Sequence, residues 1–197
     1  MAIGIIFAAS IIYTMMSDFN EMQLVKRRLF AMRNGALADN LRRAGAPYRI
    51  IFGVNLPQLV EIANDFTPSK ELAERLWANR TTRESMLLAP MLYPHELMDY
   101  DTALRWGRSV ISPEVADILC HKLLRKKDFA DELADELAAS DEVLPRYCGL
   151  RLMMNRFPAR LAHIRDIAKA ELERGEEMTS SLCRLIIDES DYLLGED

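Results

Sequence analysis

The sequence lacks the short motifs that mark the common nucleotide-dependent and zinc-dependent enzymes. None of GxxxxGK(S/T), GxGxxG and HExxH occurs in it. Its three histidines are far apart, and the adjacent Cys120 and His121 would point about 100° apart on a helix, which makes a shared metal ion difficult. These absences argue against a metalloenzyme or a cofactor-dependent enzyme, so we expect no cofactor and no metal ligands.

Glycine and proline are scarce, with eight of each among 197 residues, while half of the chain is apolar. This composition is typical of a globular protein rich in helices, and the length suits one domain with a sizeable core. The three cysteines, Cys120, Cys148 and Cys183, are an odd number and lie inside helical patterns. They give no sign of a disulfide framework, so we expect a reducing, cytoplasmic setting.

A long apolar run occurs only at the start of the chain, over residues 1–16. It lacks the charged region of a signal peptide and is short for a membrane-spanning helix. The first convincing helix start is at Ser17 or Asp18, because Asp18 and Glu21 have the spacing of a capping box. We expect the functional chain to begin at Met15 or Met16. Residues 1–16 would then be an extension outside the fold, with residues 17–197 forming one domain; a membrane anchor is the alternative.

The net charge of −5 conceals an uneven distribution. Residues 166–197 hold ten acidic residues against three basic ones, so residues 1–165 carry a net charge of +2. Two segments are more basic: residues 26–49 hold seven basic residues against one acid, and residues 143–165 hold five arginines and no acid. Such clusters can bind phosphates, although composition alone favours a solvated helix surface.

The rest of the chain is a succession of capped helical patterns with short links; Asn55 is expected to start one helix, and Thr67–Ser69 to cap the next. Residues 71–76 also resemble residues 132–137, each the second half of a helical pair. We therefore predict an all-α protein of about ten helices, stacked as antiparallel pairs in a solenoid without a sheet. Residues 48–54 are expected to be buried coil. The expected helices span residues 18–33, 36–43, 55–66, 70–78, 82–92, 101–110, 112–125, 129–139, 141–155, 158–175 and 179–194.

The helix expected over residues 112–125 carries a carboxylate on a polar stripe. Ser112 is a good N-cap, and Pro113 suits the first helical position. An apolar stripe predicts one face in the core, and the opposite side carries Asp117. The apolar stripe consists of Val115, Ile118, Leu119 and Leu123, and the polar stripe of Glu114, Asp117, His121 and Arg125.

Several short segments follow one another in an order that resembles the AlkD-like DNA alkylation repair proteins. These are Gly53–Leu59, Leu76 with Trp77, Glu84 before Leu87–Ala89, Ile111–Cys120 and Ser140–Arg146. The resemblance covers roughly residues 20–160. It implies a HEAT-like α-α superhelix with a DNA-binding groove on its concave face.

The resemblance also implies a chemistry. In that family the helix that matches residues 111–124 bears the catalytic aspartate, and Asp117 falls at its position. Arg146 falls at a DNA-contacting arginine; we expect Arg151 in the same groove and Arg108 as a further DNA contact. The implied partner is alkylated duplex DNA, and the implied reaction is hydrolysis of the N-glycosidic bond of an alkylated purine. A carboxylate beside the sugar would stabilise the positive charge that develops there. Pro113 stands where the family has a tryptophan, four residues before the aspartate.

Two functions from different classes therefore remain. The first is a DNA alkylation repair-like protein that binds duplex DNA, as a glycosylase or as a DNA-binding relative of one. The second is a non-catalytic HEAT-like scaffold that binds another protein, for which its acidic end could serve. We expect a monomer in either case.

Each candidate residue also has a purely structural interpretation. Asp117 could be a surface carboxylate paired with His121, one turn further on. Arg146 could form a salt bridge with Asp141 or Glu142.

Three further residues are expected to be structural. Trp77 and Trp106 lie on apolar helix faces and are expected in the core. Glu84 is expected to pair with a neighbouring arginine.

Overall fold

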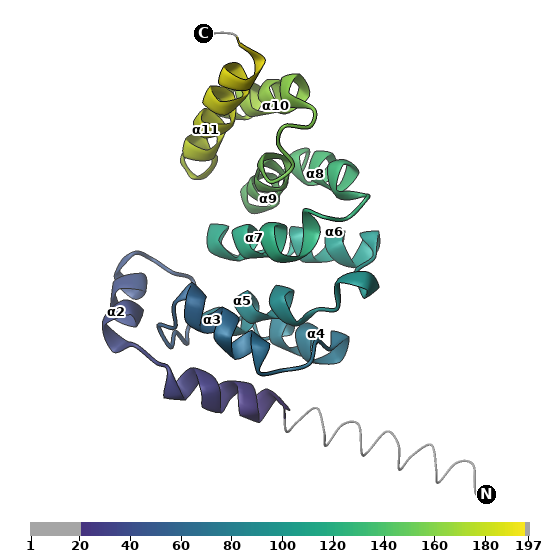
Figure 1. Ribbon diagram of the computed structural model, residues 1–197. Coiled ribbons are helices and arrows are strands. Elements are labelled where there is room, and N and C mark those ends of the chain that lie inside the picture. The colour runs from purple at the N-terminus through teal and green to yellow at the C-terminus, as the bar shows by residue number, and fades with distance from the viewer. Residues whose placement is uncertain (1–20, 196–197) are drawn as a thin grey trace, which may run out of the picture. The chain divides into compact units, whose positions relative to one another are not determined.

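The computed structural model describes residues 21–195, most of which lie in helices joined by short turns. The expected extension, residues 1–16, lies outside this range. Between residues 21 and 195 no strand forms, and one isolated bridge joins Ile50 to Thr82. The all-α prediction is confirmed. The chain divides after Leu97 into two compact units (Figure 1), and the single domain expected over residues 17–197 stays a prediction.

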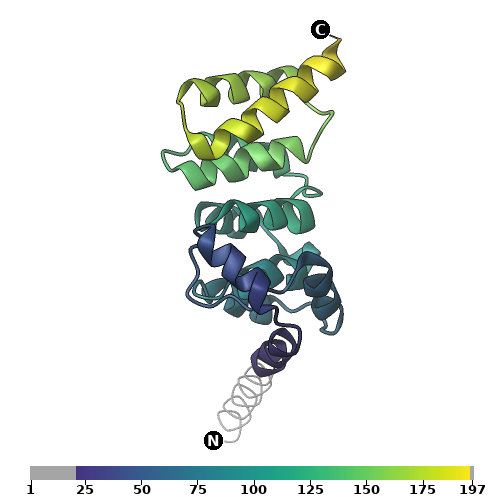
Figure 2. The same ribbon diagram turned by 90° about the vertical axis from the view of Figure 1, so that its left-hand side faces the viewer.

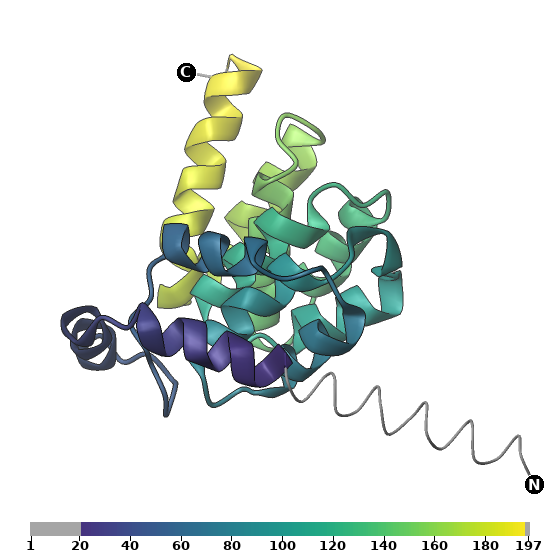
Figure 3. The same ribbon diagram turned by 60° about the horizontal axis from the view of Figure 1, so that its bottom comes forward.

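The first unit packs its helices around an apolar core. α4 and α5 form a pair, and α3 packs on α5. α2 lies at the edge of this unit, away from α4 and α5 (Figures 1 and 3). Residues 21–31 are helical, followed by α2 (Gly35–Arg43), α3 (Leu56–Asn64), α4 (Lys70–Ala78), α5 (Arg83–Leu92) and the short 3-10 turn η1 (His95–Leu97). The expected N-caps Asn55 and Ser69 do begin α3 and α4, and each side chain accepts a hydrogen bond from a backbone N–H of the first turn.

A buried carboxylate fixes the link between α2 and α3. Glu84, fully buried on α5, accepts hydrogen bonds from the backbone N–H groups of Phe52, Gly53 and Val54. It also pairs with Arg83 at 2.9 Å, which confirms the expected arginine partner. Gly53 has φ +74°, and a Cβ there would lie 2.1 Å from the backbone oxygen of Asn34. The link is coil as predicted, apart from the bridge at Ile50, which is 43% exposed.

The second unit consists of successive helices in which neighbours along the chain pack together. α8 pairs with α9 and α10 pairs with α11; the last pair lies side by side in Figures 1 and 2. The elements are α6 (Tyr100–Arg108), α7 (Pro113–Leu119), the π-helical turn η2 (Cys120–Leu124), α8 (Ala130–Ala138), α9 (Val143–Met154), α10 (Leu161–Glu173) and α11 (Glu177–Leu194). Trp106 is fully buried here and Trp77 nearly so in the first unit, so the expectation that both are core residues is confirmed.

α9 is the central helix of the second unit, because it packs against α6, α7, α8, α10 and α11. Gly149 permits its close approach to α8: a Cβ there would lie 2.5 Å from the backbone nitrogen of Ala138 and 2.7 Å from the carbonyl oxygen of Ala134. Cys148, Leu150 and Leu152 are buried around it. Polar side chains on α9 are therefore held in place by the helices on either side.

Two predicted helices differ in detail. The helix over residues 112–125 has the right extent, but α7 passes into a π-helical turn, in which the backbone N–H of Arg125 bonds the carbonyl of Cys120. The extra residue per turn interrupts the regular polar stripe expected there. The helix predicted from residue 158 begins only at Leu161, because Arg160 has a left-handed backbone with φ 57°.

Candidate functional site

Asp117 points away from the core on α7. The Ser112 hydroxyl caps this helix by accepting a hydrogen bond from the Val115 N–H at 3.3 Å. Val115 and Leu119 are fully buried on the opposite side of the helix, as the apolar pattern predicted. The Asp117 side chain retains 34% exposure. The carboxylate is thus half-buried and reachable from solvent.

Two side chains of α9 meet this carboxylate. The Tyr147 hydroxyl donates a hydrogen bond to Oδ1 of Asp117 at 3.0 Å, and Nε of Arg151 lies 3.0 Å from the same oxygen. Tyr147 and Arg151 are four residues apart, so they share one face of α9. The structure therefore brings Asp117 and Arg151 together, and the partners of Asp117 are not the His121 that the structural interpretation assumed.

Opposing effects act on the charge of Asp117. Burial raises the pKa of Asp117 above its usual value, whereas Arg151 and the Tyr147 hydrogen bond lower it and Glu114 raises it slightly. Burial also raises the pKa of Tyr147, and the neighbouring Asp117 carboxylate raises it further. Tyr147 is therefore a neutral hydrogen-bond donor at physiological pH, and Arg151 is the cation that stabilises the Asp117 carboxylate.

The Arg151 guanidinium is not fully used by these contacts. Its Nε faces Asp117 as an ion pair, but within residues 21–195 the geometry gives this buried nitrogen no hydrogen bond. Its Nη1 reaches only the sulfur of Met154, at 3.6 Å. With 30% of the side chain exposed, Arg151 keeps donors for an additional acceptor.

The turn that follows α7 carries further basic groups. Lys122 is exposed and Arg125 is partly exposed, and neither forms an ion pair within the described part of the chain. All three basic residues act on His121: burial lowers the pKa of His121, and the charges of Arg125, Lys122 and Arg151 lower it further. We call Lys122, Arg125 and Arg151 the basic cluster. Of these three residues, the sequence named Arg151 as a DNA contact and Arg125 only as part of the polar stripe, because the pattern does not show which cations lack a carboxylate partner.

Two cysteine thiols lie behind Asp117 in the core. Cys120 follows α7 and Cys148 lies on α9; both are buried, and their sulfurs are 3.6 Å apart. Burial raises the pKa of Cys120, and the neighbouring Cys148 and Asp117 raise it further. The Cys120 thiol therefore stays protonated, and both cysteines act as packing groups between α7 and α9.

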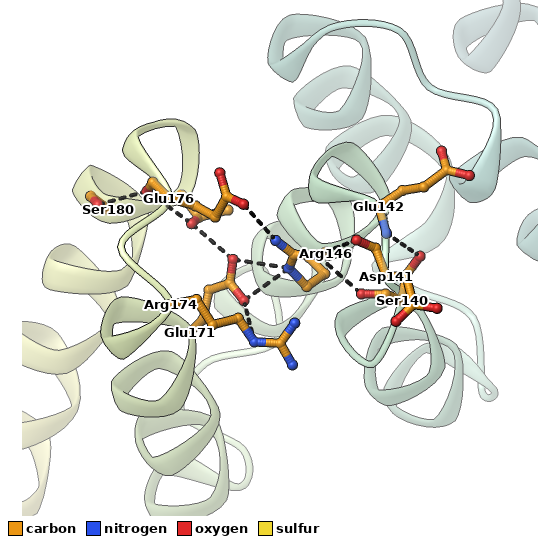
Figure 4. A network of polar contacts seen from close by, with 9 residues as sticks. Ser140, Asp141, Glu142, Arg146, Glu171, Arg174, Glu176 and Ser180 are labelled. Atoms are coloured by element: carbon orange, nitrogen blue, oxygen red, sulfur yellow. Dashed lines mark hydrogen bonds and ion pairs between the residues drawn. The ribbon is translucent and has the colours of Figure 1, made fainter.

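Arg146 does not lie with Asp117 but at the buried centre of an ion-pair network (Figure 4). Its Nε bonds both carboxylate oxygens of Glu171 at 3.0 and 2.9 Å, and its Nη1 bonds the carbonyls of Ser140 and Asp141. Glu176 adds an ion pair at 3.5 Å.

With 3% exposure, Arg146 presents no donor to solvent in this arrangement. Its assignment as a DNA contact stays a prediction that this geometry does not favour. The expected salt-bridge alternative was also wrong in its partners, because Arg146 bonds the Asp141 carbonyl and pairs with Glu171 and Glu176 rather than with the Asp141 or Glu142 carboxylates.

Arg108, at the end of α6, pairs with Glu136 on α8 at 2.6 Å and is 58% exposed. Tyr100 donates a hydrogen bond to the other oxygen of Glu136 at 2.5 Å. Burial and this hydrogen bond raise the pKa of Tyr100 to about 12. Arg108 is accessible to a ligand, but within residues 21–195 it contacts Glu136 and neither Asp117 nor Arg151.

Residues 21–195 contain neither a candidate metal site nor a candidate membrane-spanning helix. No group of three or more histidine, cysteine or acidic side chains in that range could hold a metal ion. No helix in the same range is long and apolar enough to cross a membrane.

Comparison with known proteins agrees with the fold. No curated protein matches the sequence. A solved structure is similar, with a TM-score of 0.73 and 19% identity over 83% of this chain and 73% of that chain. It is described as "a new family of proteins related to the HEAT-like repeat DNA glycosylases with affinity for branched DNA structures". The HEAT-like helical fold expected from the sequence is therefore confirmed. The profile of the family described as "DNA alkylation repair enzyme" matches residues 25–181, and this chain belongs to that family.

Proposed function

We propose that this protein binds DNA through the basic cluster of the second unit, with Asp117 beside the bound backbone. The observation that carries the proposal is that Arg151 pairs with Asp117, while Lys122 and Arg125, in the turn that follows α7, form no ion pair within residues 21–195. Cations that no carboxylate neutralises, such as Lys122 and Arg125, can contact phosphates without first giving up an ion pair. Membership of the DNA alkylation repair family supports the same partner.

The remaining arginines of residues 143–165 are already paired within the second unit. Arg156 pairs with Asp131, Arg160 with Asp135 and Arg165 with Asp191. Each pairing neutralises an arginine that the sequence had suggested as a phosphate contact. Of the five arginines in this segment, Arg151 best suits a DNA contact, because its side chain is 30% exposed and its Nη2 has no protein partner within residues 21–195.

The reaction we propose for this site is hydrolysis of the N-glycosidic bond of an alkylated purine. The bond between C1′ and the base nitrogen breaks, and its electron pair leaves with the cationic base. Water adds to C1′ and gives up a proton. Asp117 would stabilise the positive charge at the sugar and orient the water. Tyr147 would hold the carboxylate in place through its hydrogen bond.

A second outcome for the same surface is binding of branched DNA without hydrolysis. The similar solved structure is described as having affinity for branched DNA, although at 19% identity it supports the fold alone. Pro113 in place of an aromatic residue before Asp117, together with the charge of Arg151 against Asp117, also favours binding over hydrolysis.

A binding titration tests the proposal. Fluorescence anisotropy on a duplex and on a four-way junction, over a range of salt concentrations, should show affinity that falls steeply with salt. Lys122→Ala with Arg125→Ala should weaken binding at least about tenfold and lower the salt slope by about 0.9 for each lost phosphate contact. Lys169→Ala is the matched control, since Lys169 is exposed on α10 and forms no ion pair within residues 21–195. If both variants lost DNA affinity equally, the basic cluster would not be a specific DNA-binding site.

A second assay separates hydrolysis from binding. Release of methylated purines from alkylated DNA should disappear in Asp117→Asn, while DNA affinity stays the same or rises because a negative charge is removed. If the wild-type protein binds DNA but releases no base, the surface serves in binding alone.

Protein binding by α11 is the second candidate function. Met178, Leu185 and Tyr192 are exposed at seven-residue intervals along this helix, at 41%, 47% and 72%. Asp188 and Glu189 lie exposed between them. This pattern fits a partner helix that is apolar on one side and basic at its edges. Tyr192→Ala should abolish capture of such a helix without changing DNA affinity.

A further inference from the structure

The first unit contains an arginine-rich pocket that the site around Asp117 does not use. We propose that this pocket binds a segment of single-stranded DNA, with a base on its aromatic wall and phosphates on its arginines. The pocket is lined mainly by Phe30, Arg33, Arg42, Arg49, Ile50 and Phe52. All of these belong to the first unit, so the proposal stands or falls separately from the function proposed for the second unit.

The size of the pocket suits part of a nucleotide chain. Its volume is about 430 Å³, within the range of small-molecule sites, roughly 300–1,000 Å³. It lies between the end of the first described helix, the start of α2 and the link before α3. Gly35, the first residue of α2, forms part of the wall, and a Cβ there would meet nothing within 4 Å, so a ligand can approach the backbone.

The charge of the pocket is positive. Arg49 is exposed and forms no ion pair within residues 21–195, and Arg33 donates only to the backbone carbonyl of Phe30, at 2.9 Å. Arg42 is partly neutralised by Asp39 at 2.8 Å. No acidic residue lies in the first turn of α2, so its dipole adds to the positive potential. Arg33 and Arg49 therefore suit two successive phosphates.

The same pocket presents a surface for stacking. Phe30 is 57% exposed, which is unusual for so large an apolar side chain. The Arg33 guanidinium lies over its ring at 3.9 Å from the centroid, so the two side chains form one contiguous surface. A nucleobase can stack on this layer, since aromatic and guanidinium planes are the usual platforms for unpaired bases.

The opposite wall is held rigidly. The N–H of Phe52 is bonded to the buried Glu84 carboxylate at 3.1 Å, and its carbonyl accepts the Asn34 N–H at 2.8 Å. Ile50 is fixed by its bridge to Thr82. A preformed wall of this kind limits the ordering cost of binding.

The combination of features identifies the ligand class. Cations alone would suit a duplex backbone, but a duplex keeps its bases stacked inside and offers none to Phe30. A single strand exposes both its phosphates and the faces of its bases. The pocket therefore suits an unpaired strand better than a duplex.

The experiment uses the full chain and a fluorescein-labelled thymine decamer. Arg33→Ala with Arg49→Ala should weaken binding at least about tenfold and lower the salt slope by about 0.7 for each lost contact. Phe30→Ala should weaken it at least about fivefold, whereas Phe30→Tyr should retain it. A decamer of abasic residues, with the same charge, should bind the wild type as weakly as the thymine decamer binds Phe30→Ala.

Matched controls make the result decisive. Arg27 is an exposed arginine on the helix that bears Phe30, and it does not line the pocket. Arg27→Ala therefore removes one positive charge without removing a pocket contact. Lys122→Ala with Arg125→Ala should reduce duplex and junction binding but leave thymine-decamer binding unchanged. Equal losses in Arg27→Ala and Arg49→Ala, or equal binding of the abasic decamer, would overturn the proposal. Circular dichroism melting confirms that each variant is folded.

Discussion

Two ion pairs start from the same helix, α9, five residues apart, and differ in almost every physical respect. Arg146 and Glu171 are each 4% exposed, and the Arg146 guanidinium bonds a carboxylate and two backbone carbonyls (Figure 4). Arg151 and Asp117 are 30% and 34% exposed, and the Nε of Arg151 lacks a hydrogen bond within residues 21–195. The first pair is closed by the protein, and the second is open to a ligand.

The difference in solvent access decides what each pair can do. A buried charge that loses its partner cannot recover hydration, so a buried pair is fixed in place and strongly coupled to folding. A half-exposed pair gains little from its attraction, because water competes for both partners. Arg151 can therefore exchange part of its contact with Asp117 for a phosphate, whereas Arg146 cannot leave Glu171 without destabilising α9, α10 and α11.

The largest effect should come from breaking the closed pair. Arg146→Ala leaves Glu171 buried without its main cation, and it also removes the donors to the Ser140 and Asp141 carbonyls. We expect a loss of about 3–5 kcal/mol in the free energy of unfolding, measured by urea denaturation. DNA affinity of the remaining folded protein should be unchanged.

A double variant separates charge from packing. Arg146→Met with Glu171→Leu removes both charges and retains most of the volume, so it should be close to wild type in stability. If Arg146→Ala instead melted like the wild type and lost DNA affinity, Arg146 would be a DNA contact after all. The two ion pairs would then not differ in their access to a ligand.

The sequence predicted the helices well because their signals are local. Asn55 and Ser69 are the N-caps of α3 and α4, as expected. The spacing of apolar residues also correctly predicted that Val115 and Leu119 are buried. Side-chain hydrogen bonds within one turn and the periodicity of apolar residues need no knowledge of distant parts of the chain. The π-helical turn after α7 was not predicted, because the apolar spacing of residues 112–125 indicated one regular α-helix.

The ionic partners could not be predicted, because they come from distant residues. Residues 143–165 contain five arginines and no acid, which suggested a phosphate-binding surface. In the structure each of these arginines meets a carboxylate from another helix, such as Glu171 for Arg146 and Asp191 for Arg165. The acidic composition of residues 166–197 was the available signal, since it supplies Glu171 and Glu176 for Arg146 and Asp191 for Arg165. Its pairing with the basic segment follows only from the fold.

The next largest effect should come from removing the open arginine. Arg151→Ala should weaken DNA binding about tenfold, because one phosphate contact is lost and the Asp117 charge is left uncompensated. Its effect on stability should stay within about 1 kcal/mol.

Arg156 provides a control of nearly equal geometry. It pairs with Asp131 at 3.0 Å, with exposures of 28% and 34%. Arg156→Ala removes the same charge from the same unit, and anisotropy with duplex DNA should show little change. Equal losses for Arg151→Ala and Arg156→Ala would mean that only net charge matters and that Asp117 marks no site.

A smaller effect should follow from removing the hydroxyl that holds Asp117. Tyr147→Phe deletes the donor to Oδ1 but keeps the ring, so we expect a loss of about 0.5–1.5 kcal/mol in stability. The pKa of Asp117 should rise further, because this hydrogen bond lowers it. Carboxyl chemical shifts measured by NMR across a pH titration would show the change. An unchanged pKa would mean that Arg151 alone controls the carboxylate.

The smallest effect concerns the pH dependence of the open pair. Burial raises the folded-state pKa of Asp117 above 3.8, and Arg151 and Tyr147 offset this only in part. Between 3.8 and the raised value, the folded protein binds more protons at Asp117 than the unfolded chain does. The contribution of Asp117 to the free energy of unfolding therefore falls as the pH rises through that interval. Asparagine does not titrate, so Asp117→Asn should gain stability relative to the wild type between about pH 3.5 and about pH 7, by no more than about 1 kcal/mol. Urea denaturation of both proteins at these two pH values measures the difference. If the variant instead loses relative stability at the higher pH, attraction to Arg151 outweighs burial, and the pair on α7 and α9 is closed in the same sense as Arg146 and Glu171.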